Sequence, residues 1–304
     1  MPETAQLADL YSVIEESARV LGTPCSREKV WPILTAYGEV IPHATIAFRI
    51  GTGVRYAGDV DWRFSVPKEI DPYAVARANG LTPETGHPIG VLLSEMRKRC
   101  PVDGLGVDFG AARGFKKIYA FFPPNEMQSL TALIDIPSMP RSVADNLDYF
   151  ARYGLDTDKL NALAIDYPHR TVNLYFGALP AECLEPGTIV SMIRELGLPH
   201  PSEPMVRLGE KAFGIYVTLN WESSKAERFC YAVMNAESSA LPVPLHPQIE
   251  QFLKNVAHDD AGGRFIYYAG TSSIGEENFK IHSYFKWDAR MLDQMLLSES
   301  EDNP

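Results

Sequence analysis

The amino-acid sequence predicts an α+β fold: a ten-stranded antiparallel β-barrel with a solvent-filled lumen, surrounded by a ring of α-helices. Three observations carry this prediction. Hydrophobic residues switch repeatedly between helical spacing and the two-residue spacing of strands. The strand-like segments come in adjacent pairs, and strands joined by short turns pair antiparallel. The pattern of helices followed by two strands recurs about five times without an intervening linker, so we expect a single domain spanning residues 1–304.

The first repeat shows how each element is assigned. Leu7, Leu10 and Ile14 follow helical spacing in residues 5–21, and 27–40 form a second helix interrupted near Pro32. Period-two alternation then marks the strand-like segments 44–50 and 55–66. The later helical segments are 72–79, 89–99, 126–133, 142–152, 186–196, 203–210, 247–257 and 288–296. The later strand-like segments are 102–109, 114–122, 160–167, 170–177, 212–221, 227–235, 264–271 and 278–287.

Composition and charge exclude several classes of protein. The 304 residues are 45% hydrophobic and 22% charged, the balance of a globular chain with a sizeable core. A net charge of −11 argues against a nucleic-acid or anionic-membrane partner, because both need a basic surface. A small anionic ligand remains possible, since local cations in a cavity can hold it.

Cysteine usage and the absence of export signals indicate a reduced compartment. The four cysteines lie far apart without a CxxC pair, so they predict neither a disulfide framework nor a zinc site. The start of the chain has no basic, apolar export pattern, and no apolar run approaches the roughly 18 residues that span a bilayer. We therefore expect a cytoplasmic protein, and a monomer.

Each strand-like segment has one apolar face and one mixed face, because consecutive strand residues point to opposite sides. Segment 115–122, for example, alternates Ile118 and Ala120 with Lys117 and Tyr119. The mixed faces combine cations, phenols and aromatic rings with few acids; they include Arg49, Asp61, Arg63, Lys117, Tyr119, Phe121, Asn173, Tyr175, Tyr216, Lys280, His282 and Tyr284.

Two interpretations of the mixed face are open. A single antiparallel strand commonly turns one face to bulk water. Solvent-facing strands, however, mix Lys, Glu, Thr and Ser, whereas cations beside phenols describe a pocket for an anion joined to an apolar or cationic group. The composition therefore favours an inward-facing ligand pocket.

Five stretches carry a resemblance to a known family. They are residues 114–123 (GFKKIYAFFP), 136–140 (IPSMP), 150–155 (FARYGL), 172–176 (VNLYF) and 216–222 (YVTLNWE). With these the sequence resembles, over nearly its whole length, the bacterial aromatic prenyltransferases of the ABBA fold, whose repeated α-β-β-α units form a ten-stranded barrel. The resemblance implies transfer of a dimethylallyl or geranyl group from its diphosphate to an electron-rich aromatic small molecule in secondary metabolism.

The resemblance also implies a set of site residues. The diphosphate would be bound by the positions that match the family's anion site, together with two arginines nearby: Arg49, Arg63, Lys117, Asn173, Tyr216, Arg228 and Lys280. The prenyl chain and acceptor would be lined by Asp61, Tyr119, Phe121, Ala162, Tyr175, Phe213, Gly214, His282 and Tyr284. Ionisation of the donor would depend on Lys117, Tyr175, Tyr216, Arg228 and Lys280 as the catalytic residues.

A metal ion is not expected, although some family members hold Mg²⁺ with an aspartate that matches Asp61. Arg49 and Arg63 here occupy positions near the diphosphate where the metal-dependent relative has small polar residues. A guanidinium is permanently charged and pairs with phosphate oxygens, so we expect turnover without Mg²⁺ and no other cofactor. The alternative is that Arg63 only forms a structural ion pair with Asp61.

Departures from the family's pattern concern the pocket. Ala162 and Gly214 replace bulkier side chains, His282 replaces a glycine, and His169 replaces a lysine. More room suits a larger acceptor such as a tricycle, although a lone His is more often a packing residue. After the acceptor attacks the allylic cation, the freed diphosphate, water or His282 would take the proton.

Two other classes of function compete with this assignment. One is a non-catalytic barrel that binds an isoprenoid or an aromatic metabolite, because a fold alone does not establish catalysis. The other is a diphosphate hydrolase, which would release a prenyl alcohol without an acceptor. The sequence leaves open the donor length, the acceptor and the position of prenylation.

Overall fold

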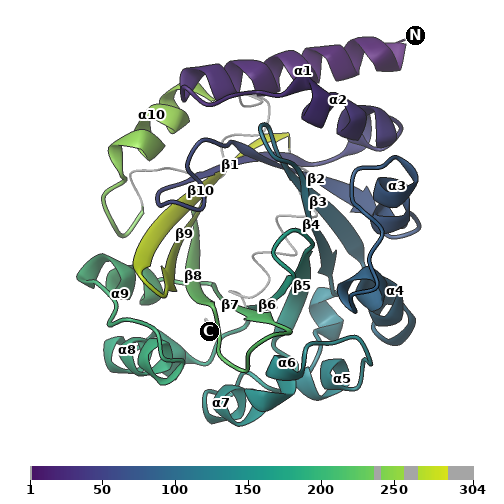
Figure 1. Ribbon diagram of the computed structural model, residues 1–304. Helices are drawn as coiled ribbons and strands as arrows, with labels where there is room; N and C mark the ends of the chain where they lie inside the picture. The colour runs from purple at the N-terminus through teal and green to yellow at the C-terminus, as the bar shows by residue number, and fades with distance from the viewer. Residues whose placement is uncertain (1, 236–240, 257–265, 287–304) are drawn as a thin grey trace.

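The computed structural model describes residues 2–235, 241–256 and 266–286 and contains a closed antiparallel β-barrel (Figure 1). Each strand pairs with its neighbours in sequence, and β1 pairs with β10 to close the barrel. The strands are β1 (Ile46–Gly51), β2 (Asp61–Pro67), β3 (Gly104–Gly110), β4 (Gly114–Phe121), β5 (Leu160–Asp166), β6 (Thr171–Phe176), β7 (Gly214–Asn220), β8 (Arg228–Asn235), β9 (Ile266–Ser273) and β10 (Glu276–Lys286). The predicted ten-stranded barrel is confirmed.

Helices surround the barrel on all sides in Figure 1. The α-helices are α1 (Pro2–Val20), α2 (Arg27–Ala36), α3 (Pro72–Ala78), α4 (Ile89–Arg99), α5 (Leu130–Ile134), α6 (Arg141–Asp145), α7 (Leu147–Arg152), α8 (Pro186–Glu195), α9 (Glu203–Gly209) and α10 (Pro247–Asn255). Short 3-10 turns are η1 (Ile41–His43), η2 (Pro124–Glu126) and η3 (Ala181–Leu184). The predicted helix at 288–296 lies outside the described residues.

Three expected elements differ in extent. Residues 55–60, expected in a strand, belong to the loop before β2, where turns close from Tyr56 N to Gly53 O and from Asp59 N to Tyr56 O. The expected helix 126–133 begins only after Ser129, whose side chain caps α5 by accepting from Ala132 N. The expected helix 142–152 is divided at Asn146 into α6 and α7.

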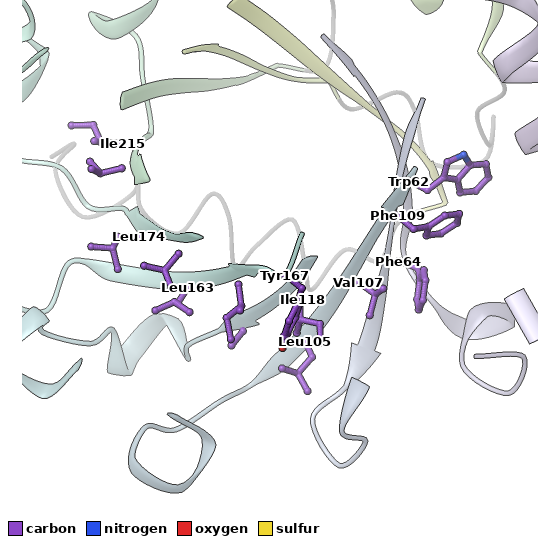
Figure 2. Close-up of a cluster of buried hydrophobic side chains, with 14 of the residues drawn as sticks. Trp62, Phe64, Leu105, Val107, Phe109, Ile118, Leu163, Tyr167, Leu174 and Ile215 are labelled. Carbon is purple, nitrogen blue, oxygen red and sulfur yellow. The ribbon is translucent and has the colours of Figure 1, made fainter. Parts of the chain in front are cut away.

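The hydrophobic core lies between the outer face of the barrel and the helices. Figure 2 shows Trp62, Phe64, Phe109 and other apolar side chains on the side of the strands away from the lumen. Phe48 and Trp62 pack with ring centroids 4.1 Å apart. The apolar face of each strand therefore faces the helices, as the alternation predicts, and the mixed face lines the lumen.

The barrel has two different ends. Pairs β1–β2, β3–β4, β5–β6, β7–β8 and β9–β10 are joined by loops without helices at one end, which we call the hairpin end. The α-helices between consecutive pairs connect at the opposite end, which we call the helix-side end. A lumen residue is therefore placed along the barrel axis by its position in its strand.

No helix within residues 2–235, 241–256 and 266–286 has both the length and the hydropathy that crossing a bilayer requires. The four cysteines are free thiols, and Cys100, Cys183 and Cys230 are buried.

Candidate active site

Mixed-face side chains from all around the barrel meet in the lumen. A buried cluster separate from the main core joins residues of β1, β7, β8, β9 and β10; its members are Ala47, Phe213, Tyr216, Cys230, Ala232, Tyr267, Ala269 and Tyr284. Tyr175 of β6 packs against this cluster. The prediction that the mixed faces look inward is therefore confirmed.

A cavity of about 230 Å³ lies toward the hairpin end of the lumen. The predicted site residues that line it are Arg49, Asp61, Lys117, Tyr119, Asn173, Tyr175, Tyr216, Arg228 and Lys280. The other predicted residues, which do not line it, occupy strand positions nearer the helix-side end: Arg63, Phe121, Ala162, Phe213, Gly214, His282 and Tyr284. The structure thus divides the predicted site into a cation-rich part and a deeper, mainly aromatic part.

Carboxylates in the lumen are more numerous than the sequence indicated, and they pair with the predicted cations. Asp108 of β3 lies opposite Arg63 in the strand pairing, and Asp166 of β5 lies opposite Lys117. Both carboxylates are 1% exposed. The expectation that the inward face contains few acids is therefore wrong, because the strand register places an aspartate across from each of these cations.

An alternating chain of charges runs along β2, β1 and β3. Lys116 contacts Asp59 at 2.7 Å and also binds Asp61. Arg49 uses Nε and Nη2 to bind Asp61, and its Nη1 lies 2.9 Å from Asp108 Oδ2. We call this series, extended by Arg63 at Asp108, the charge chain; its members are Lys116, Asp59, Asp61, Arg49, Asp108 and Arg63.

Two carboxylates engage Arg49. Its Nε and Nη2 donate to Asp61, its Nη1 lies 2.9 Å from Asp108 Oδ2, and the residue is 7% exposed. Arg49 also lines the cavity, and its contact with a diphosphate stays a prediction. Arg63 does form an ion pair, but with Asp108 at 2.8 Å, so the alternative that pairs it with Asp61 is wrong.

Lys116 reaches the lumen through an irregularity that period-two alternation cannot reveal. The pairing of β3 with β4 shifts between Asp108 and Phe109, so Lys116 is an extra residue opposite this step. Gly110 leaves space for the contact between Lys116 and Asp59, because a Cβ on residue 110 would lie 2.1 Å from Asp59 Oδ2. Lys116 was not among the predicted site residues.

Asp108 is held in its charged form by the two arginines. Burial alone would raise its pKa, but the charges of Arg63 and Arg49 outweigh burial and keep the pKa well below the usual value. Its Oδ2 also accepts a hydrogen bond from the Tyr119 hydroxyl at 2.9 Å. Asp108 thus fixes three side chains of the lumen.

Lys117 belongs to a second ionic group at the hairpin end. Its Nζ lies 3.2 Å from Asp166 Oδ2, and Arg55 from the loop before β2 lies 2.8 Å from the same oxygen. His169 Nδ1 is 2.8 Å from the other oxygen. Burial lowers the pKa of Lys117 to about 7 although Asp166 opposes the shift, so a bound anion would favour its protonated form.

Four donors that line the cavity are not committed to a carboxylate or to another strong acceptor. Arg228 approaches Glu227 only through Nη1 at 3.4 Å, and its buried Nη2 has no hydrogen-bond partner among the described residues. Within the same part of the chain, the amide nitrogen of Asn173 and the hydroxyl of Thr271 are buried without a partner, and no ion pair to Lys280 is found. Buried donors without acceptors mark a site built for an anion.

Thr218 prepares Asn173 for this role. Its hydroxyl donates to Asn173 Oδ1 at 2.6 Å, which directs the amide nitrogen to a different acceptor. Neither Thr218 nor Thr271 was predicted. Both lie on mixed strand faces. Their roles follow from hydrogen bonding between strands, which cannot be read from the amino-acid composition.

Aromatic rings line the lumen beyond the cations. The Tyr175 and Tyr216 centroids are 4.2 Å apart, and Tyr216 stacks with Tyr267 at 6.2 Å. The Tyr216 hydroxyl would lie 3.1 Å from a Cβ at Gly214, so it is directed toward the helix-side end. Tyr216 also lines the cavity, so its contact with a diphosphate stays a prediction, and the space left by Gly214 is partly taken by Tyr216 itself.

His282 is a neutral base inside the lumen. It is 3% exposed, its ring lies 4.5 Å from that of Tyr267, and Nε2 has no hydrogen-bond partner in the described part of the chain. Burial, followed by the charges of Arg63 and Arg49, holds its pKa well below the usual value. The same effects make this imidazole a weaker base than a histidine in water.

Comparisons with known proteins agree with this geometry. The family model for aromatic prenyltransferase Orf2 matches residues 5–295. The chain belongs to the aromatic prenyltransferase family. It is 48% identical to 5,10-dihydrophenazine-1-carboxylate 9-dimethylallyltransferase of Streptomyces anulatus, over 99% of this chain and 100% of the relative. It is 47% identical to flaviolin linalyltransferase of Streptomyces virginiae, over 96% and 97% of the two chains.

A solved structure supports the fold of this aromatic prenyltransferase. The crystal structure of prenyltransferase PriB in its apo form superposes with a TM-score of 0.50 at 12% identity, covering 91% of this chain and 96% of that one. The curated relatives named above are transferases, which supports a transferase over a non-catalytic binding barrel.

Proposed function

We propose that this aromatic prenyltransferase ionises dimethylallyl or geranyl diphosphate in its lumen and transfers the prenyl group to an electron-rich, multi-ring aromatic acceptor without Mg²⁺. The observation that carries the proposal is the group of uncommitted donors around the cavity, with aromatic rings directly beyond them. An allylic diphosphate has the same two parts, an anion joined to an apolar chain.

The diphosphate is assigned to Arg228, Lys280, Lys117, Asn173 and Thr271. Arg228 has only a long ion pair to Glu227 at 3.4 Å, Lys280 has none among the described residues, and the Asn173 and Thr271 donors are buried and unsatisfied. Donors aimed at charge that develops during bond breaking stabilise the leaving diphosphate more than the intact donor. These residues would therefore accelerate cleavage of the carbon–oxygen bond.

The allylic cation is assigned to the rings of Tyr175 and Tyr216. A cation over an aromatic face gains about 0.5–2 kcal/mol, and a closed aromatic wall keeps water from quenching it. Tyr119 is less suited to this task, because the Arg63 guanidinium already lies 3.8 Å from its ring centroid. The aromatic acceptor then attacks the cation, and the resulting ring adduct loses a proton to the freed diphosphate, to water or to His282.

Multi-ring acceptors fit the lumen and the relatives. The relatives' names specify a dihydrophenazine carboxylate and flaviolin, and both belong to small-molecule biosynthesis. Ala162 and Gly214 lie on the lumen face near the helix-side end, where they leave more room than larger residues would. A dihydrophenazine or a hydroxylated naphthalene is the acceptor class that we would test first.

The test of function measures release of inorganic diphosphate by the purified protein with each donor, with and without an acceptor panel. We expect release only when a dihydrophenazine or hydroxynaphthalene is present, together with a product whose mass has increased by the prenyl group. Release of free prenyl alcohol without an acceptor would identify a hydrolase instead. Binding of the donor without formation of either the prenylated acceptor or the prenyl alcohol would identify a non-catalytic barrel.

The residues around Asp61 do not fit a magnesium site. One carboxylate oxygen accepts from Arg49 and the other from Lys116, so a metal ion would have to compete with two bound cations for Asp61. Mg²⁺ demands near-octahedral oxygen ligands, and cations bound to Asp61 already supply the compensating charge. We therefore assign no step of the reaction to a metal.

Turnover is accordingly expected to survive chelation. The rate of product formation in excess EDTA should lie within about twofold of the rate with added Mg²⁺, because the charges that stabilise diphosphate are side chains. The measurement is an initial rate under saturating donor and acceptor. Activity that disappears in EDTA and returns only with Mg²⁺ would contradict the proposal.

A further inference from the structure

Arg63 presents free donors to a part of the lumen that differs from the diphosphate cavity. Only its Nε is engaged, at 2.8 Å from Asp108 Oδ1, and neither terminal nitrogen has a hydrogen-bond partner among the described residues. The side chain is 12% exposed, as is that of Lys117, which lines the cavity. Because Arg63 is on the lumen face, that exposed part is turned toward bound ligands.

The position of Arg63 separates it from the diphosphate donors. It is absent from the lining of the cavity that contains Lys117, Arg228 and Lys280. On β2 it lies one lumen position farther from the hairpin end than Asp61. Strand pairing sets Arg63 level with Asp108 and Lys117, so it lies at the border of the cavity, and we assign it to the acceptor rather than to the leaving group.

The guanidinium is held in a fixed orientation. Asp108 binds Nε, and the plane of the group lies over the Tyr119 ring at 3.8 Å. Tyr119 is fixed in turn, because its hydroxyl donates to the same carboxylate. A guanidinium fixed at Nε keeps its terminal nitrogens in one direction, which suits paired hydrogen bonds to a carboxylate.

The neighbours of Arg63 leave space and favour negative charge. Ala47 is its partner on β1, and the next lumen positions toward the helix-side end are Ser65 and Gly106. The charges that depress the pKa of His282 come from Arg63, Arg49, Lys280 and Lys117, all of them cations. An anionic substituent entering this region would meet small side chains and the terminal nitrogens of Arg63, whose Nε binds Asp108.

We infer that Arg63 binds a carboxylate on the aromatic acceptor, so that this enzyme selects aromatic carboxylates over uncharged analogues. The inference rests on the proposed function, because it assigns the acceptor half of the same site. Bidentate pairing would fix the ring relative to the donor carbon and so also determine which ring position is prenylated.

The kinetic test compares wild type with R63Q and R63K on two acceptors, a dihydroxynaphthoate and the corresponding dihydroxynaphthalene. We expect R63Q to raise KM for the carboxylated acceptor about 10- to 100-fold, the range that loss of a charge-assisted pair produces. The KM of R63K for the carboxylated acceptor should lie between those of wild type and R63Q, because lysine keeps the charge without the paired geometry. Breaking the Arg63–Asp108 pair lowers activity on both acceptors, so the readout is the ratio of kcat/KM for the carboxylated acceptor to that for the uncharged one, which should fall about 10- to 100-fold in R63Q.

Binding without turnover gives an independent readout. Quenching of tyrosine and tryptophan fluorescence by a naphthoate and by the matching naphthamide should show a preference for naphthoate in wild type that is absent in R63Q. Arg141, which is 90% exposed, supplies the matched control R141Q. If R63Q instead weakens donor binding, or weakens both ligands equally, the inference is overturned. Wild type that prenylates no acceptor at all would overturn the proposed function, while the naphthoate preference still tests Arg63.

Discussion

Replacing Arg228 with methionine is expected to lower kcat/KM for the prenyl diphosphate about 10²- to 10³-fold while leaving the free protein at least as stable as wild type. The first effect follows because removing one preorganised donor to a developing anion costs about that much. The second follows because the free protein buries a guanidinium whose Nη2 has no acceptor among the described residues. Burial also lowers the pKa of Arg228, which means that its charged form is disfavoured until an anion binds.

Two measurements separate these effects. Donor saturation kinetics give kcat/KM, and thermal unfolding with and without inorganic diphosphate gives the stability of each state. Diphosphate should raise the melting temperature of wild type by mass action but that of R228M very little. The matched control is R207M, because Arg207 is 51% exposed and its ion-pair partner in the described part of the chain is the exposed Glu203. A variant that is destabilised yet keeps its response to diphosphate would contradict the assignment.

Much of the site could be predicted because alternation along a strand does not depend on how the strands pair. Lys117, Asn173, Arg228 and Lys280 reach the lumen whatever their register, since every second residue of a barrel strand faces inward. The apolar faces were predicted for the same reason. Local periodicity was therefore sufficient for the fold and for the direction of these side chains.

What could not be predicted depends on contacts between strands. The pairing of Arg63 with Asp108 and of Lys117 with Asp166 follows from register, which no single strand encodes. The inward position of Lys116 comes from a bulge, and the direction of the Tyr216 hydroxyl from packing over Gly214. These contacts decide which carboxylates Arg49 and Arg63 pair with, and they do so without changing the fold.

The division between paired and unpaired cations explains how one lumen can serve two ligands. The charge chain pairs Arg49 and Lys116 with Asp59, Asp61 and Asp108, so this part of the lumen wall contains its own compensating acids. Arg228 on β8 and Lys280 on β10, the strand next to β1, have weaker or no ion pairs in the described part of the chain, and we assign their charge to the diphosphate. Arg63 ends the chain with two terminal nitrogens that have no partner among the described residues, so the same network positions the proposed acceptor site.

Changing Asp108 to asparagine is therefore expected to destabilise the fold by about 3–5 kcal/mol, the usual cost of removing one partner from a buried ion pair. The carboxylate is 1% exposed and receives Arg49, Arg63 and the Tyr119 hydroxyl. Urea unfolding at pH 7 measures the loss. The matched control D145N removes an acid whose partner Arg141 is 90% exposed, and it should cost less than about 1 kcal/mol.

The pH dependence of this difference tests whether charge is the cause. Arg63 and Arg49 overcome the effect of burial and hold the folded-state pKa of Asp108 well below its unfolded value of about 3.9. The carboxylate therefore contributes its full stabilisation above that unfolded value and loses it as the pH falls toward the folded-state pKa. The stability gap between wild type and D108N should accordingly be constant from neutral pH to about pH 5 and narrow below about pH 4. A gap that stays the same at acid pH would mean that Asp108 stabilises the barrel through its shape and hydrogen bonds, and the arginines would then not depend on its charge.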